Sequence, residues 1–146
     1  MGCDIHTFCE RLTHPDGREL IPDLHPFEDG RSYALFGWLA GVRNYSAVTP
    51  LSKPRGLPPD TVAPREMFED YYHSASYVTL DELLRFDYSQ MMEDRRVTIN
   101  GNGGCTAEPG GGVRMTYAVF LGPWYFAWVL RLYAAGVDRI VFGFDS

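Results

Sequence analysis

An acid and an imidazole alternate near the start of the chain, where residues 3 to 10 read Cys-Asp-Ile-His-Thr-Phe-Cys-Glu. In a strand, Asp4 and His6 would lie on one face and Cys3, Ile5 and Cys9 on the other. Asp4 and His6 would be roughly 7 Å apart, so that together they can hold a metal ion or a phosphate group. The alternative is structural, with Asp4 capping a loop or pairing with an arginine and His6 a satisfied, half-buried histidine.

Asp145 ends the last predicted strand, and it would lie beside the first strand if the two end strands pair. The sequence therefore predicts a divalent metal site of Asp4, His6 and Asp145, for zinc, manganese or magnesium. Asp145 can equally be a terminal surface charge.

A second histidine, His73, belongs to the segment His-Ser-Ala-Ser. We predict that this segment connects two helices and that His73 joins Asp4 and His6 in one cleft as a catalytic acid or base. Ser74 and Ser76 are predicted ligand-binding residues. The alternatives are that His73 faces solvent and that a serine only caps the following helix.

Two loop arginines are candidate anion ligands. Arg43 and Asn44 follow the first predicted helix, and Arg55 lies in a proline-rich loop. Guanidinium groups bind phosphate or carboxylate with two parallel hydrogen bonds, and loops held by proline lose little entropy on binding. Each arginine can instead pair with one of the carboxylates of residues 66 to 94, where eight acidic residues accompany only Arg85.

The elements that must position these residues are a hairpin and a final strand. The segment His-Pro-Asp-Gly-Arg at positions 14 to 18 predicts a turn that joins strands 2 to 12 and 18 to 22. Residues 139 to 144, Arg-Ile-Val-Phe-Gly-Phe, are predicted to form the final strand. Met115 to Ala135 is the strongest predicted helix, which Pro123 should kink or divide. We predict an α+β fold in a single domain of residues 1–146. A small sheet of the hairpin and the C-terminal strand would pack on helices, and the 115 to 135 helix would cover the Cys3 face.

The remaining segments read as short helices and loops. Thr79 and Glu82 form a capping box at the start of a helix, and Gly41 ends an earlier helix. We further predict an irregular loop over 42 to 64, a helix from Pro64 to Tyr72, a short strand over 96 to 100, and a mobile glycine-rich loop over 100 to 112.

Composition and charge limit the classes of function. The net charge of −6 argues against non-specific nucleic-acid binding, which requires a basic face. No apolar run approaches the 18 residues of a membrane span, and the N-terminus lacks the pattern of a secretory signal. Cys3 and Cys9 would be roughly 20 Å apart along one strand, too far to bridge. We therefore expect reduced thiols, including Cys105, in a cytoplasmic protein with no membrane partner. The sequence does not indicate an oligomeric state.

Five sequence blocks follow one another along the chain: residues 1–6, 33–36 with 39–44, 54–58, 73–79 and 141–145. Together they resemble a family of small bacteriophage-encoded proteins that begin Met-Gly-Cys-Asp-Ile-His. The resemblance covers the whole chain and implies an accessory protein in the cytoplasm of an infected host cell, acting on nucleotide pools or against host defence. Other members have a second histidine where this chain has Ala75, which puts a four-ligand metal site in doubt.

These observations favour a metal-assisted hydrolase or phosphodiesterase that acts on an anionic, phosphate-bearing small molecule of the nucleotide type. The alternative is a non-catalytic binder that sequesters a nucleotide signal of host defence. A third hypothesis is an inhibitor that docks an acidic helix face on a host protein.

Overall fold

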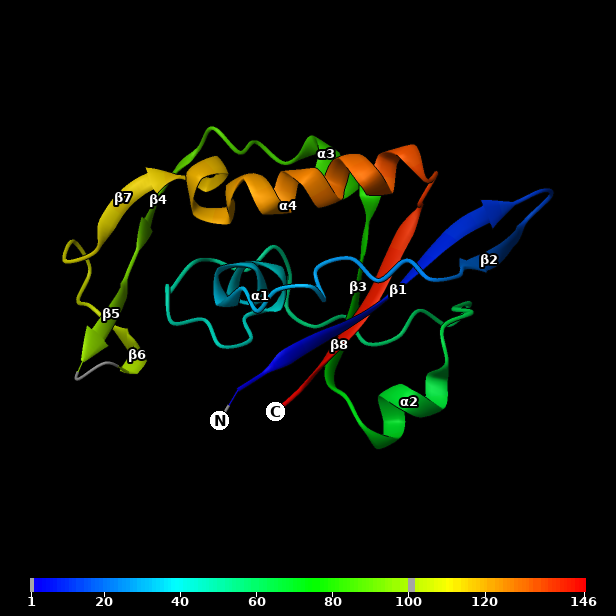
Figure 1. The fold of residues 1–146 in the computed structure, drawn as a ribbon, viewed down its shortest axis with the longest axis horizontal. Coiled ribbons are helices and arrows are strands. Elements are labelled where there is room, and N and C mark those ends of the chain that lie inside the picture. The colour runs from blue at the N-terminus through cyan, green and yellow to red at the C-terminus, as the bar shows by residue number, and fades with distance from the viewer. Residues whose placement is uncertain (1, 100–101) are drawn as a thin grey trace. The chain divides into compact units, whose positions relative to one another are not determined.

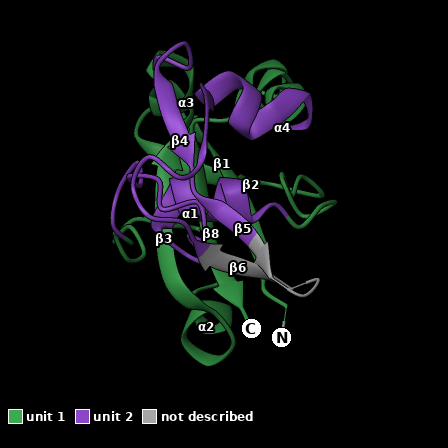
Figure 2. Ribbon diagram, turned by 90° about the vertical axis from the view of Figure 1, so that its left-hand side faces the viewer, with its two compact units in different colours: residues 1–31, 54–86, 126–146 green, residues 32–53, 87–125 purple. Residues whose placement is uncertain are grey.

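The computed structural model describes residues 2–99 and 102–146 and divides them into two compact units (Figures 1 and 2). Unit 1 holds residues 1–31, 54–86 and 126–146, and unit 2 holds residues 32–53 and 87–125. The chain thus passes between the units four times. The predicted single domain over residues 1–146 stays a prediction.

Unit 1 is built on a four-stranded antiparallel sheet of order β2-β1-β8-β3, which confirms the predicted α+β fold class. The N-terminal hairpin and the C-terminal strand pair as expected, with Asp4 opposite Asp145 and Glu10 opposite Arg139. The elements of unit 1 are β1 (Asp4–Thr13), β2 (Gly17–Ile21), α2 (Arg65–Asp70), β3 (His73–Thr79), α3 (Leu80–Arg85) and β8 (Arg139–Asp145).

Both faces of β1 carry packed side chains. On the predicted core face, Cys3, Ile5 and Cys9 are buried, and Cys3 and Cys9 are not joined in a disulfide, as expected. The side chain of Cys105 lies outside the described residues. Burial raises the pKa of the Cys9 thiol to about 12, so this thiol is inert at neutral pH.

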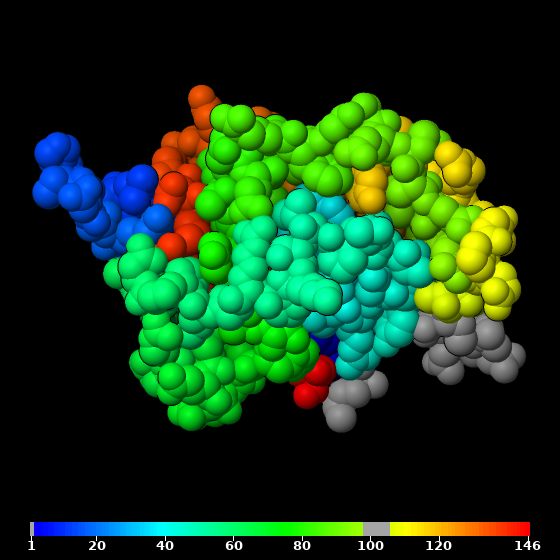
Figure 3. All heavy atoms as spheres, turned by 180° about the vertical axis from the view of Figure 1, so that it is seen from behind, coloured from blue at the N-terminus to red at the C-terminus, as the bar shows by residue number. Residues whose placement is uncertain are grey.

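The opposite face of the sheet is covered by α2 and the segment 54–64, which lie side by side on the surface of unit 1 (Figure 3). Phe68 of α2 and Ala63 form a cluster with Val141 of β8, and Phe8 of β1 packs against it. Along this face of β1, Asp4 is exposed and His6 is partly exposed, whereas Glu10 is buried.

One predicted connection proves to be a strand. Residues 73–76 belong to β3, which pairs with β8 and contains a bulge between His73 and Ser76, where Ser74 has φ 55°. The segment 77–79 is Tyr-Val-Thr, residues that favour strands, and it extends the pairing along the second edge of β8. Because residues 73–76 lie between two helices, the sequence pattern indicated a connection and not a strand. The capping box of Thr79 and Glu82 is confirmed at the start of α3.

Unit 2 has two small sheets, one of β4 with β7 and one of β5 with β6. The predicted loop over 100 to 112 contains β6. Its mobility stays a prediction, and residues 100 and 101 lie outside the described residues. The fully buried rings of Trp38 and Tyr125 meet edge to face at 5.7 Å. The elements are α1 (Tyr33–Ala40), β4 (Met91–Asp94), β5 (Arg96–Ile99), β6 (Asn102–Thr106), β7 (Val113–Thr116) and the start of α4.

Helix α4 (Tyr117–Ala134) begins in unit 2 and ends in unit 1. It is broken at Gly122, with φ 80° and ψ 170°, directly before Pro123, so the predicted division at this proline is confirmed. In unit 1, Trp128 packs on Phe27 with ring centroids 6.3 Å apart and donates a hydrogen bond to Asp29 at 2.8 Å. Cover of the Cys3 face by this helix stays a prediction. None of the described helices is long and apolar enough to cross a bilayer.

Candidate functional site

The strand pairing brings His6 and Asp145 into contact. His6 lies opposite Gly143 and Asp4 opposite Asp145, so the side chains of Asp4, His6 and Asp145 share one face. The Nε2 atom of His6 is 2.7 Å from Oδ2 of Asp145. The two side chains are 27% and 46% exposed, so this carboxylate–imidazole pair is sheltered but open to solvent.

The Tyr72 ring packs against one face of the His6 imidazole. This residue follows α2, and its ring is stacked on the imidazole with centroids 4.3 Å apart and planes 9° from parallel. Burial raises the pKa of the Tyr72 hydroxyl, and the carboxylates of Glu28 and Asp145 raise it further. Tyr72 therefore stays neutral and acts as a flat support that fixes the plane of the imidazole.

Gly143 makes this stacking possible. A Cβ atom at position 143 would lie 2.9 Å from Cβ of Tyr72 and 3.2 Å from the ring of Phe68. Glycine inside a strand commonly marks such a close approach of neighbouring groups. The sequence thus contained a signal for this site, because Gly143 interrupts the apolar run of the last strand and lies opposite His6 in the register.

We expect Gly143→Ala to lower the free energy of unfolding by about 1–3 kcal/mol, as overpacking of a close contact does. The added methyl group must push Tyr72 and Phe68 off the sheet, which also separates Tyr72 from His6. Chemical denaturation measures the first effect, and the ring-current shift of the His6 protons measures the second. Unchanged stability together with an unchanged His6 shift would show that the close approach is not real.

The Asp145 carboxylate decides which His6 nitrogen carries the proton. An ionised carboxylate only accepts hydrogen bonds, so Nε2 of His6 must be the donor, which leaves the lone pair on Nδ1 when the ring is neutral. No described residue forms a hydrogen bond with Nδ1 of His6. Nδ1 is therefore the nitrogen that can accept a proton from a bound molecule.

Asp4 is held by an arginine. Arg31 donates to both carboxylate oxygens through Nε at 2.9 Å and Nη2 at 3.0 Å. The hydrogen bond from Arg31 is the main reason why the pKa of Asp4 is lowered. The pairing of Asp4 with an arginine was the structural alternative for this residue, and the sequence did not indicate Arg31 as the partner.

The predicted metal ligands Asp4, His6 and Asp145 share a face without forming a metal-binding group. Among the side chains that the structure describes, no three of His, Cys, Asp or Glu are arranged to hold a metal ion. Each of these side chains already has another partner: Arg31 donates to both oxygens of Asp4, and Nε2 of His6 faces Asp145. This donor set does not fit zinc, manganese or magnesium.

His73 and His6 lie on opposite faces of the sheet. His73 lies opposite Phe144, and the two rings are 6.1 Å apart, so His73 shares the face of Phe144, whereas His6 shares the face of Gly143 and Asp145. Its Nε2 is 3.0 Å from Oγ of Ser146 and its Nδ1 is 2.9 Å from Oγ of Ser74. The predicted cleft of Asp4, His6 and His73 is thus not formed, because residues 143 to 146 of the chain alternate between faces.

Arg55 and Ser76 anchor a loop to the sheet. Ser76 is buried and accepts a hydrogen bond from the backbone N–H of Arg55 at 3.0 Å. The Arg55 guanidinium binds both carboxylate oxygens of Glu82, at 2.8 and 2.7 Å, and donates to the carbonyl oxygen of Tyr77. The hydrogen bond from Arg55 is the main cause of the lowered pKa of Glu82. The structure thus shows the predicted alternative of pairing with a carboxylate of residues 66 to 94.

We expect Arg55→Ala to lower the free energy of unfolding by about 1 kcal/mol at neutral pH, near the upper end for partly exposed ion pairs. The pKa of Glu82 is lowered in the folded state, so this stabilisation is present above the unfolded pKa and is lost as pH falls through the folded value. The difference from wild type should therefore shrink in acid, below about pH 4.

Arg85→Ala is the matched control, because Arg85 forms an exposed pair with Asp81 one helical turn away. Denaturation curves at several pH values should show a smaller effect for Arg85→Ala. Equal effects of the two variants at every pH would contradict the anchoring role of Arg55.

Arg43 and Asn44 belong to unit 2. Arg43 has φ 50°, donates to the hydroxyl of Tyr45 at 3.2 Å and lies over the ring of Tyr33. Asn44 bonds to both the N–H and the carbonyl group of Val48, at 3.1 and 2.7 Å. The Asn44 side chain therefore shapes the loop that it begins.

The pockets described in the structure do not include the predicted site residues. A pocket of about 320 Å³ in unit 2 is lined by Val48, Arg95 and neighbouring residues, and one of about 280 Å³ in unit 1 by Leu84, Tyr133 and neighbours. The His6 site is partly exposed to solvent.

The site that the structure supports consists of His6, Asp145 and Tyr72, with Asp4 and Arg31 beside them. Sequence reasoning identified His6, Asp145 and Asp4, and it missed Tyr72 and Arg31, whose positions depend on α2 and on the approach of residue 31 to the start of β1. Comparison of the chain with models of protein families, with curated proteins and with solved structures finds no match.

Proposed function

We propose that the protein is a hydrolase of a phosphate-bearing small molecule of the nucleotide type, in which His6 transfers the proton. The observation that carries the proposal is the 2.7 Å hydrogen bond between His6 and Asp145, with the imidazole stacked on Tyr72. A carboxylate that binds one imidazole nitrogen orients the ring and stabilises its protonated form, the arrangement that general bases use.

In the proposed reaction, Nδ1 of His6 takes a proton from water while the water oxygen bonds to phosphorus. The P–O bond to the leaving group breaks, and the protonated imidazole returns its proton to the leaving oxygen. Asp145 stays ionised and compensates the positive charge of the imidazolium. Arg31, held beside this site by Asp4, is the guanidinium that supports binding of an anionic substrate. The donor set does not fit a metal ion, so no step depends on one.

The test is to incubate the purified protein with a panel of nucleotides, cyclic nucleotides and simple phosphate esters, with and without EDTA. We expect turnover of at least one substrate at the same rate in both conditions. Turnover that stops in EDTA and returns with zinc, manganese or magnesium would replace this mechanism by the metal-assisted one.

A non-catalytic binder that sequesters a nucleotide signal is the second candidate. It is favoured by the partial exposure of the His6 and Asp145 side chains, because active sites usually exclude water from the reacting groups. Binding of a nucleotide by calorimetry with no product after prolonged incubation would favour this candidate over the hydrolase.

The resemblance to small bacteriophage-encoded proteins supports a role in the cytoplasm of an infected cell, against a defence signal or on nucleotide pools. In that setting, expression of the protein should change the level of one nucleotide in host cells, measured by mass spectrometry of extracts. An unchanged nucleotide profile would argue against both candidates.

A further inference from the structure

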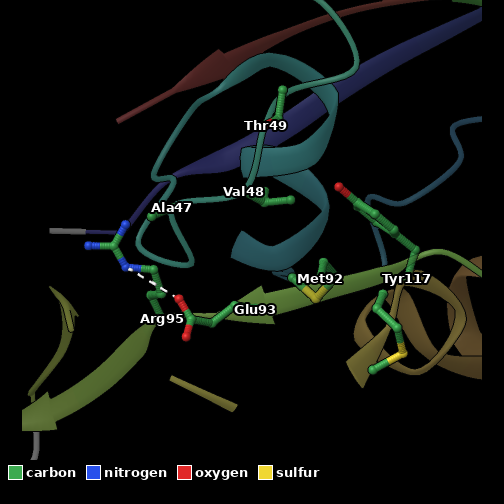
Figure 4. A pocket seen from close by; sticks show the side chains of 8 residues that line it. Ala47, Val48, Thr49, Met92, Glu93, Arg95 and Tyr117 are labelled. Carbon is green, nitrogen blue, oxygen red and sulfur yellow. Dashed lines mark ion pairs between the residues drawn. The ribbon is translucent and has the colours of Figure 1, made fainter. Parts of the chain in front are cut away.

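A polar pocket of about 320 Å³ in unit 2 is separate from the residues of the His6 site. Figure 4 shows Arg95 at one end and Tyr117 at the other, with Val48, Met92 and Glu93 between them. The volume is at the lower end of the range for small-molecule sites. The pocket is also lined by Ala47, Thr49 and Met91.

Arg95 is fixed at its backbone and at Nε. Its N–H donates to the carbonyl oxygen of Ser46 at 3.0 Å, and its own carbonyl oxygen accepts from Ala107 at 2.8 Å. Its Nε atom donates to the carbonyl oxygen of Ala107 at 2.6 Å and lies 3.9 Å from Glu93. The orientation of the guanidinium plane is thereby set before any ligand binds, so little entropy is lost on binding.

The two terminal nitrogens of Arg95 point away from Glu93 (Figure 4). Within the described part of the chain, neither Nη1 nor Nη2 of Arg95 forms a hydrogen bond. Two parallel N–H donors of a fixed guanidinium match the two oxygens of a carboxylate or a phosphate.

The Glu93 carboxylate repels an anion bound to Arg95 less than a carboxylate without hydrogen bonds would. Its two oxygens accept hydrogen bonds from the backbone N–H groups of Gly110 and Gly112, at 3.1 and 3.3 Å. Arg95 Nε adds a positive charge 3.9 Å from one of these oxygens. Its negative charge is thus compensated within the pocket wall.

The opposite wall is suited to an apolar body. Val48 and Met92 are buried in this wall, and the Tyr117 ring forms the far end. Asn44 holds Val48 in place through its two hydrogen bonds to the Val48 backbone, so this wall is also preformed.

We propose that this pocket binds a small molecule that carries an oxyanion, phosphate or carboxylate, at one end and an aromatic or apolar body at the other. The oxyanion is held by the terminal nitrogens of Arg95, and the body lies against Met92 and Tyr117. This site is independent of the proposed hydrolase activity.

The test is calorimetric titration of the full chain with adenosine monophosphate, phenylacetate, inorganic phosphate and adenosine. Adenosine monophosphate or phenylacetate should bind more tightly than inorganic phosphate or adenosine, and the tighter of the two identifies the oxyanion. Arg95→Gln should weaken this binding at least about 10-fold, which corresponds to the loss of a charged double hydrogen bond. Arg114→Gln is the matched control, because Arg114 is exposed on β7 and does not line the pocket, and it should change the affinity less than about 2-fold.

A second measurement avoids the risk that Arg95→Gln loosens the fold. In wild-type protein, NMR signals of the Arg95 guanidinium should shift on addition of the ligand that binds, while those of Arg114 stay in place. The proposal is overturned if neither adenosine monophosphate nor phenylacetate binds, or if Arg95→Gln and Arg114→Gln weaken binding equally. It is also overturned if the compound that binds shifts the His6 signals and leaves the Arg95 signals unchanged.

Discussion

Arg139→Met is expected to lower the free energy of unfolding by about 3–5 kcal/mol, because it leaves the buried carboxylate of Glu10 without its partner. Glu10 is fully buried, and Arg139 Nε donates to it at 2.6 Å. The other oxygen of Glu10 accepts from the Thr61 hydroxyl and the Val62 N–H, each at 2.7 Å. These bonds fix the carboxylate in place, so it cannot turn outward to solvent when the arginine is lost.

The matched control is Arg11→Met, which breaks a half-exposed ion pair between Arg11 of β1 and Glu19 of β2. Exposed pairs contribute at most about 1 kcal/mol, so denaturant titration should separate the two variants clearly. The double variant Glu10→Leu with Arg139→Met should recover part of the lost stability, since no buried charge then remains unpaired. Equal costs for Arg139→Met and Arg11→Met would contradict the buried pair.

His6→Ala is expected to reduce turnover by about 10²–10⁴-fold, the usual contribution of a general acid or base. The substitution removes the nitrogen that accepts the proton and leaves the strand pairing of β1 and β8 intact. Steady-state kinetics on the substrate identified by the nucleotide panel measures the effect, and circular dichroism shows that the fold is retained.

His14→Ala is the matched control, because His14 is an exposed turn residue. His73→Ala distinguishes two accounts of the site. Since His73 lies on the face of Phe144, its loss should change turnover by less than about 3-fold, far below the contribution of a general acid or base. A large loss with His73→Ala would mean that both histidines act on one substrate, as the sequence predicted.

The sheet was predictable from the sequence because its signals are local. The turn at residues 14 to 18, the alternation around Ile5 and the apolar final strand each indicate their own element. Helix α4 and its break beside Pro123 follow from the same kind of local rule. Strand β3 was missed because it lies between two helices and residues 73–76 have no strand pattern of their own, while its pairing partner β8 is distant in the sequence.

Part of the site was also predictable, because strand alternation is a local signal. Alternation placed Asp4 and His6 on one face, and pairing of the end strands placed Asp145 beside them. The face of His73 depends on the bulge in β3 and on its register with Phe144, which no local pattern gives. The ion-pair partners of the arginines could not be predicted from the sequence either. Arg55 meets Glu82, and Arg31 meets Asp4, only in the folded chain.

The most direct test of the His6 site is the protonation pattern of the His6 ring, measured by ¹⁵N NMR of the wild-type protein with the ring in its neutral form. The 2.7 Å bond to Asp145 predicts a proton on Nε2 and a bare Nδ1, and Asp145→Asn should abolish this preference. A neutral His6 ring that carries its proton on Nδ1, or that averages between the two forms in wild type, would contradict the assignment of Nδ1 as the catalytic base.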